Sequence, residues 1–229
     1  MTSRLVKAVR LHAVHVVLRA RLHGYLRHRR DLIRLGSELC GWWVPAQVAA
    51  PGAVAYCAGA GEDITFDLAL LARGCSVTTL DPTPRAVAYV KSLLIQDERF
   101  RFVPVGVWSE EDAELPFYAP RNPSSSNFSA VNLHGTSDYI LARVKPVQTL
   151  MTEFGDTHID ILKLDIEGAE YRVLESLLES GPLATVLCVE FDQPQPPSET
   201  IRMVRKILGA GYELVHIEFY NYTFVRVRD

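Results

Sequence analysis

The order of strand-like and helix-like segments constrains the fold of this chain more than any other feature. Short apolar, β-branched runs alternate with amphipathic segments of about ten residues from residue 53 onwards. Parallel neighbouring strands need a long crossover between them, and a helix usually supplies it. The pattern predicts βαβ units and a parallel sheet, with strands at 53–57, 76–80, 100–107, 159–164 and 185–191 and helices at 63–73, 84–94, 147–154, 169–180 and 199–210.

Two regions depart from this alternation. Residues 109–145 contain several acids, Pro116, Pro120 and a polar cluster, which is typical of loops or of loops that include a hairpin. The last two strand-like segments, 212–219 and 222–228, leave no room for a helix and must pair as an antiparallel hairpin. The predicted fold class is therefore α/β, with a mostly parallel seven-stranded sheet that ends in an antiparallel hairpin. This layout resembles the Rossmann-like class I methyltransferase fold.

Charge divides the chain into two parts. Residues 1–36 hold nine Lys and Arg residues against one acid, Asp31, whereas the remainder holds fifteen basic and twenty-six acidic residues. We expect a basic helical N-terminal extension over 1–45 and one Rossmann-like domain over 46–229. An acidic domain does not suit nucleic acid, because binding there requires positive potential against phosphates.

The basic extension has more than one interpretation. It is a helical appendage whose basic side chains are solvated or pack on the acidic domain, an organelle transit peptide or, with weak support from its pattern, a membrane-surface helix. Its apolar run, 13–18, is interrupted by His15 and is too short for a membrane span or a secretory signal. The four cysteines are scattered without a C-x-x-C pair, which favours reduced thiols and a cytoplasmic protein.

A glycine-containing turn follows the first predicted strand, in the stretch AYCAGAGEDITFD. Gly59 and Gly61 let the backbone approach a ligand closely. A dinucleotide fingerprint would place a third glycine where Ile64 stands, and the acids Glu62 and Asp63 would repel a pyrophosphate. The turn therefore predicts a ligand that carries an ammonium or sulfonium charge. The alternative is a tight turn in which Asp63 only caps the next helix.

Asp81 ends the second predicted strand, 22 positions after Gly59. In Rossmann-type sites an acid at this distance accepts hydrogen bonds from ribose hydroxyls, although Asp-Pro is also an ordinary start of a turn. Together with the acidic turn it predicts an adenosine-containing cationic cofactor, a description that S-adenosylmethionine fits. Trp108, after the third strand, either stacks on the adenine or belongs to the core.

The stretch ILKLDIEGAE places three acids directly after a buried strand. If this fourth parallel strand lies beside the first, Asp165 emerges next to Gly59, at the edge where open α/β sheets bind ligands. Lys163 lies within the buried strand and needs a charged partner. Glu167 and Glu170 also fit the first turn of a helix, where acids favour the dipole, and this explains Glu170 fully.

The run LKLDIEGAEYRVLESL resembles the FkbM family of S-adenosylmethionine-dependent methyltransferases. The family motif K-[IL]-D-[IV]-E-G-x-E is matched by Lys163, Asp165, Glu167, Gly168 and Glu170. CAGAGEDITFD is similar to the family's glycine motif, although Cys57 stands where many members have an acid and Asp63 replaces a glycine. The resemblance covers about residues 50–229.

The resemblance implies transfer of a methyl group from S-adenosylmethionine to a hydroxyl oxygen of a sugar or secondary metabolite, so the expected partner is a small-molecule or glycan acceptor. Asp165 is expected to act as the base or, with Glu167, to bind a divalent cation such as Mg²⁺, which is the less favoured role; Lys163 would orient either carboxylate. No dedicated metal site is predicted, and the sequence indicates no oligomeric state. The polar loop 122–129 either covers the acceptor or merely connects strands. A catalytically silent cofactor-binding module and an NAD-dependent enzyme are the alternatives.

Overall fold

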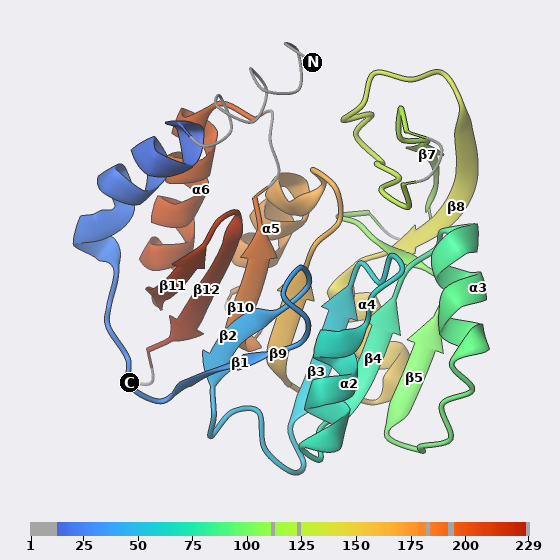
Figure 1. Ribbon diagram of the computed structural model, residues 1–229, viewed down its shortest axis with the longest axis horizontal. Helices are drawn as coiled ribbons and strands as arrows, with labels where there is room; N and C mark the ends of the chain where they lie inside the picture. The colour runs from blue at the N-terminus through green and yellow to red at the C-terminus, as the bar shows by residue number, and fades with distance from the viewer. Residues whose placement is uncertain (1–12, 111–112, 123–124, 182–183, 192–194, 228–229) are drawn as a thin grey trace.

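The structure, a computed structural model, describes residues 13–110, 113–122, 125–181, 184–191 and 195–227. Its main sheet has seven strands in the order β11-β12-β10-β9-β3-β4-β5 (Figure 1). Five of them run parallel: β3 (Val54–Ala58), β4 (Ser76–Leu80), β5 (Phe100–Val103), β9 (Ile159–Leu164) and β10 (Ala184–Glu190). The last two, β11 (Tyr212–Glu218) and β12 (Asn221–Arg226), form the predicted antiparallel hairpin.

This order confirms the predicted fold class and one specific pairing. β9 lies beside β3, as expected for the fourth parallel strand. β12 is inserted between β11 and β10 and pairs antiparallel with both. The order in which strands are added reverses between β3 and β9. In open α/β sheets a ligand crevice forms at the carboxyl ends of the two strands at such a point.

The strands of the main sheet are apolar on both sides, so both faces of the sheet must be covered. α4 (Val147–Phe154), α5 (Glu170–Glu179) and α6 (Pro197–Gly209) pack against Leu162 and Leu164 of β9 in the largest core cluster. α2 (Thr65–Ala72) packs on the opposite face of the sheet, in the cluster that contains Ile161 of β9. α3 (Pro84–Ser92) follows β4. The alternation of Ile161 and Leu162 between two clusters is the two-residue period of a strand buried on both faces.

The expectation that residues 1–45 are helical is wrong for residues 32–45. β1 (Leu32–Leu35) and β2 (Trp42–Pro45) form an antiparallel hairpin. Trp42 and Val44 are fully buried against β10 and β12, on the sheet face on which α2 also packs. On this sheet face α2 packs near β4, and the apolar hairpin covers the part formed by Val186, Cys188 and Val225.

The region 109–145 contains the hairpin that was one of its two predicted forms. β7 (Ala113–Tyr118) and β8 (Tyr139–Lys145) pair antiparallel, and the two-residue strand β6 (Gly106–Val107) joins them in a small separate sheet. The predicted strand 100–107 is therefore divided between two sheets.

The N-terminal segment begins with a helix over residues 13–22 and a short 3₁₀ turn, η1 (His23–Tyr25). Leu22 reaches the main core cluster, so this helix packs on the domain and is not a detached appendage. Within the described ranges, no helix is long and apolar enough to cross a membrane.

Candidate active site

A cavity of about 530 Å³ opens at the carboxyl ends of β3, β4 and β9, which is the edge that the topology selects. It is large enough for a cofactor of nucleoside size. Its described lining includes six acids and a single cation, Lys163; the acids are Glu62, Asp63, Asp81, Asp165, Glu167 and Glu190. A lining of this kind favours a positively charged ligand and disfavours a pyrophosphate.

The glycine turn lies against the end of β9. The backbone of Gly59 has φ +90°, and a Cβ atom there would overlap the backbone oxygen of Asp165. No other amino acid fits this approach. The predicted neighbourhood of Gly59 and Asp165 is therefore realised, with the Asp165 amide donating to the oxygen of Ala58 at 3.2 Å.

Asp81 is held at the end of β4, inside the cavity wall, but its carboxylate already has protein partners. One oxygen accepts from the amides of Ala60 and Gly61 at 2.9 and 3.0 Å, and the other accepts from the amide and hydroxyl of Thr83 at 2.8 and 2.7 Å. Four hydrogen bonds fill the acceptor capacity of a carboxylate. Asp81 thus clamps the glycine turn, and a direct bond to a ribose would replace one of these contacts.

Lys163 has the charged partners that its burial requires. Its side chain is 3% exposed, and its Nζ lies 3.0 Å from Asp165 Oδ2 and donates to the oxygen of Gly59 at 2.6 Å. Burial lowers the pKa of Lys163, but the carboxylates of Asp165 and Asp67 outweigh it and raise that pKa. The lysine is therefore a fixed cation that ties β9 to the glycine turn.

Asp67, which the sequence motifs did not single out, faces the same lysine from α2. It is buried and accepts a hydrogen bond from the hydroxyl of Thr79. Burial raises the pKa of Asp67 to about 6, although the Lys163 ammonium opposes the rise. An acid on the apolar face of an amphipathic helix is the sequence signal that could have identified it.

The two motif acids that line the cavity have opposite electrostatic environments. Burial would raise the pKa of Asp165, but Lys163 and a hydrogen bond with Glu190 prevail and hold it below its usual value. Burial and the neighbouring carboxylates of Asp165 and Glu170 raise the pKa of Glu167 to about 8. Near neutral pH the cavity therefore holds an ionised Asp165 beside a mainly protonated Glu167.

Glu170 begins α5, as expected, but it does more than favour the helix dipole. Its fully buried carboxylate accepts from the amides of Ile166 and Gly168 at 2.6 and 2.9 Å. These bonds hold the turn on which Glu167 adopts a left-handed conformation, with φ 55°. Glu170 therefore positions Glu167 and does not line the cavity itself.

Part of the polar loop 122–129 covers the cavity; Pro123 and Ser124 lie outside the described residues. Ser126, Asn127 and Phe128 line the wall. The amide group of Asn127 donates to the carboxylate of Glu167, and the hydroxyl of Ser129 donates to the backbone oxygen of Glu167 at 2.7 Å. Of the two interpretations of this loop, the covering one agrees with these contacts.

The tip of the β1–β2 hairpin forms another wall, which the sequence motifs did not indicate. Leu39 and Cys40 line the cavity. The tip is bound to the glycine turn because the hydroxyl of Ser37 donates to Asp63 Oδ2 at 2.7 Å. The other oxygen of Asp63 accepts from the amide of Thr65 at 2.9 Å, so Asp63 both joins the hairpin and caps the start of α2.

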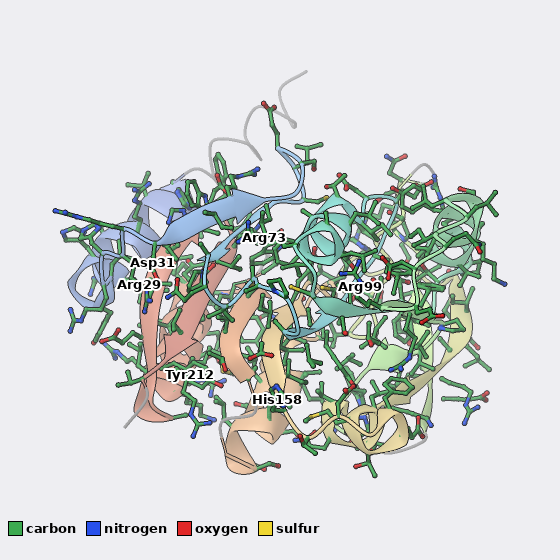
Figure 2. The ribbon with its side chains drawn as sticks, turned by 90° about the horizontal axis from the view of Figure 1, so that it is seen from below. Arg29, Asp31, Arg73, Arg99, His158 and Tyr212 are labelled. Atoms are coloured by element: carbon green, nitrogen blue, oxygen red, sulfur yellow. The ribbon has the colours of Figure 1, made fainter. Side chains whose placement is uncertain are left out.

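Glu62 reaches the cavity, whereas Trp108 and two histidines, His134 and His158, do not. Glu62 forms an ion pair with Arg85 at 2.7 Å. Trp108, proposed for adenine stacking or the core, lies in a core cluster with Phe117 and Ala169, under the guanidinium of Arg172. His158 precedes β9 and lies at the opposite edge of the sheet, where Figure 2 labels it. His134 is on the surface and contacts the backbone oxygen of Asn127.

Two further acids, Glu190 and Asp192, follow the core of the fifth predicted strand at its carboxyl end. Glu190 lines the cavity next to Asp165, whereas Asp192 lies outside the described residues. Among the described side chains, no group of three or more His, Cys, Asp or Glu residues has the arrangement of a metal site.

The reversed sheet order and the cavity at its switch point are those of the Rossmann-like class I methyltransferase fold. The model of the methyltransferase FkbM domain matches residues 54–214, and the chain belongs to this family.

The similar proteins include a probable methyltransferase-like protein 24 of Rattus norvegicus, 27% identical over 124 residues. This match covers 54% of the chain and 28% of the rat protein. The human protein of the same name is also 27% identical, with 27% of its length covered. Among solved structures, the METTL16 MTase domain aligns with a TM-score of 0.49 and 10% identity, covering 96% of this chain and 81% of that one. A putative RNA methyltransferase from Pyrococcus horikoshii aligns with a TM-score of 0.42 and 13% identity, covering 96% of this chain and 100% of that one.

Proposed function

We propose that this chain uses S-adenosylmethionine to methylate a hydroxyl oxygen of a small-molecule or glycan acceptor. The observation that carries the proposal is the acid-rich cavity, which is lined both by the glycine turn and by Lys163, Asp165 and Glu167 of the motif. Acids around a nucleoside-sized space suit a sulfonium cofactor better than a phosphorylated one.

The residues present fit this cofactor. The glycine turn, clamped by Asp81, would hold its nucleoside part, and the ionised carboxylate of Asp165 would face the positive sulfur. When bound, the cofactor supplies an already activated methyl group. The protein must then hold the acceptor oxygen in line with this group and remove the hydroxyl proton as the new O–C bond forms.

The two carboxylates divide these tasks. Asp165 is fixed by Lys163 and has a depressed pKa, which makes it a weak base and a stable hydrogen-bond acceptor for orienting the hydroxyl. Glu167, with a pKa raised to about 8, is the stronger base once ionised and would receive the proton. This assignment exchanges the roles that the motif alone suggests.

Calorimetric titration with S-adenosylmethionine and S-adenosylhomocysteine tests the proposal. We expect both ligands to bind, and failure of the folded protein to bind either at millimolar ligand would refute it. Glu167→Gln should retain cofactor binding, whereas Asp165→Asn should bind the cofactor more weakly because it lacks the carboxylate that would face the positive sulfur. Both should lose transfer of labelled methyl groups to a panel of hydroxylated sugars on which the wild type is active. A wild type that binds cofactor but methylates no acceptor would favour the silent binding module instead.

A further inference from the structure

The N-terminal helix, residues 13–22, has two apolar faces. One is buried and consists of Leu18 and Leu22. The other carries Val16 and Val17, which are 51% and 47% exposed, together with the exposed Ala13 and Ala20. A helix that packs on a domain needs one apolar face, so the second is not explained by folding. We call these four exposed residues the Val16 face.

Cations flank the Val16 face on both sides. At 100° per residue, Arg19 and Arg21 fall on opposite flanks of the stripe, and both are exposed. Arg19 borders a shallow groove shared with His15 and His23. Arg21 borders a second groove, whose other wall is formed by basic residues of α6, among them Arg202 and Arg205. The apolar stripe is therefore flanked by an exposed arginine on each side, Arg19 and Arg21.

The N-terminal helix adjoins the turn between β11 and β12, on the side of its axis opposite to the Val16 face. His15 Nδ1 lies 2.8 Å from the backbone oxygen of Phe219, in the turn between β11 and β12 (Figure 1). Phe219 is 69% exposed, and Asn221, two residues further on, lines the cavity. An exposed aromatic side chain thus lies between the helix and the cavity.

We propose that the Val16 face, with Arg19 and Arg21, binds the surface of an anionic phospholipid bilayer. An apolar stripe between cationic flanks is the arrangement in which a helix lies in the plane of a membrane interface. The arginines face lipid phosphates, while Val16 and Val17 enter the acyl boundary. A nucleic acid would match the arginines but would leave the valines exposed, so the bilayer accounts for both features.

Co-sedimentation of the full chain with lipid vesicles tests this inference. We expect binding to vesicles of phosphatidylcholine mixed with phosphatidylglycerol and little binding to phosphatidylcholine alone. The double variant Val16→Ser/Val17→Ser should bind about tenfold more weakly because the apolar contact is lost. Arg19→Gln/Arg21→Gln should weaken binding by about tenfold and reduce its salt dependence. All four positions are exposed, so the variants should melt at nearly the temperature of the wild type.

Leu94→Asn is the matched control. Leu94 is 76% exposed in the turn after α3, away from the N-terminal helix, and its left-handed backbone, φ 49°, tolerates asparagine. This variant should bind vesicles like the wild type.

Several outcomes would overturn the inference: unchanged binding of Val16→Ser/Val17→Ser, equal loss in Leu94→Asn, or no binding to either vesicle. Self-association that the valine variant abolishes, without vesicle binding, would assign the face to a second copy of the chain. Cofactor titration of the same variants separates this result from the proposed enzymatic function, because none of these residues lines the cavity.

Discussion

At the scale of single residues, the cavity shows how one motif produces carboxylates with different properties. Asp165, Glu167 and Glu170 lie within six positions, yet one is paired with a buried lysine, one lies among other acids, and one accepts two backbone amides. The difference comes from partners supplied by other elements. The sequence alone predicted a group of acids at this edge of the sheet, but it could not rank their basicity.

Gly59→Ala should disrupt the cavity. The new methyl group would overlap the backbone oxygen of Asp165. The backbone at position 59 would also have to keep a left-handed φ of +90°. Overpacking and left-handed strain together are expected to cost about 3 kcal/mol in unfolding free energy, measured by denaturant titration. Gly52→Ala is the control, because Gly52 has φ +87° with nothing within 4 Å of the position that a methyl group would take. It should cost only about 1 kcal/mol, and equal losses would refute the steric argument.

Glu167 should make the folded state less stable as the pH rises. Its pKa is about 8 in the folded protein and near 4.5 in an unfolded chain, so between these values only the unfolded chain releases the proton. The unfolding free energy therefore falls with increasing pH across this window. Asp67 acts in the same direction only up to about pH 6, and His216, whose pKa is lowered by burial, acts in the opposite direction only up to about pH 6.5. The interval from about pH 7 to pH 8 therefore reports on Glu167.

Glu167→Gln, which stays neutral, should flatten this interval in chemical denaturation measured at several pH values. A variant with the same slope as the wild type would show that the titration belongs to another group. The proposed role as base further predicts that methyl transfer by the wild type increases towards pH 8.

At the scale of elements, the regular βαβ part was predictable because each strand and helix carries its own period and its own end signals. The pairing of β9 with β3 followed from topology. The β1–β2 hairpin was missed because its strands are only four residues each and follow a strongly basic segment. Trp108 was ambiguous for a related reason: its location depends on the small sheet β6-β8-β7, which its neighbours in sequence do not specify.

Arg34→Ala should loosen the hairpin tip. The Arg34 guanidinium donates to the backbone oxygens of Ser37 and Glu38 at 2.7 and 2.9 Å and to Glu218 at 3.2 Å. Losing bonds of this charged type costs about 1.5–3 kcal/mol. Because the tip walls the cavity through Leu39 and Cys40, we expect about tenfold weaker binding of S-adenosylmethionine in calorimetry.

Arg73→Ala provides the comparison for this element. Arg73, which Figure 2 labels, donates to the backbone oxygens of Ala46 and Ala49, just after β2, and does not line the cavity. It should lower thermal stability without changing cofactor affinity. If both variants bind the cofactor normally, the hairpin tip is not part of the binding wall.

At the scale of the whole molecule, the family match and the folding unit have different limits. The match ends at residue 214, inside β11, and starts at residue 54, after the hairpin. A chain of residues 54–214 would lack β12, which lies between β11 and β10, and would uncover Val186 and Cys188. We expect it to lack near-ultraviolet circular dichroism and to aggregate in gel filtration.

A chain of residues 28–229 should keep its fold. It loses Leu18 and Leu22 from the core but retains both hairpins, so a lower melting temperature with native circular dichroism is expected. A folded 54–214 fragment would show that neither hairpin is needed to close the sheet.

The insertion of β12 between β11 and β10 also affects how the protein is made. A ribosome synthesises the whole Lys163–Glu170 motif well before it reaches β12, yet the β10–β11 side of the sheet has no continuous ladder until residue 226 has left the exit tunnel. β10 presents an unpaired edge during that interval, when it is open to wrong partners. The cavity wall that carries Asn221 is therefore completed only after the whole Lys163–Glu170 motif has been synthesised.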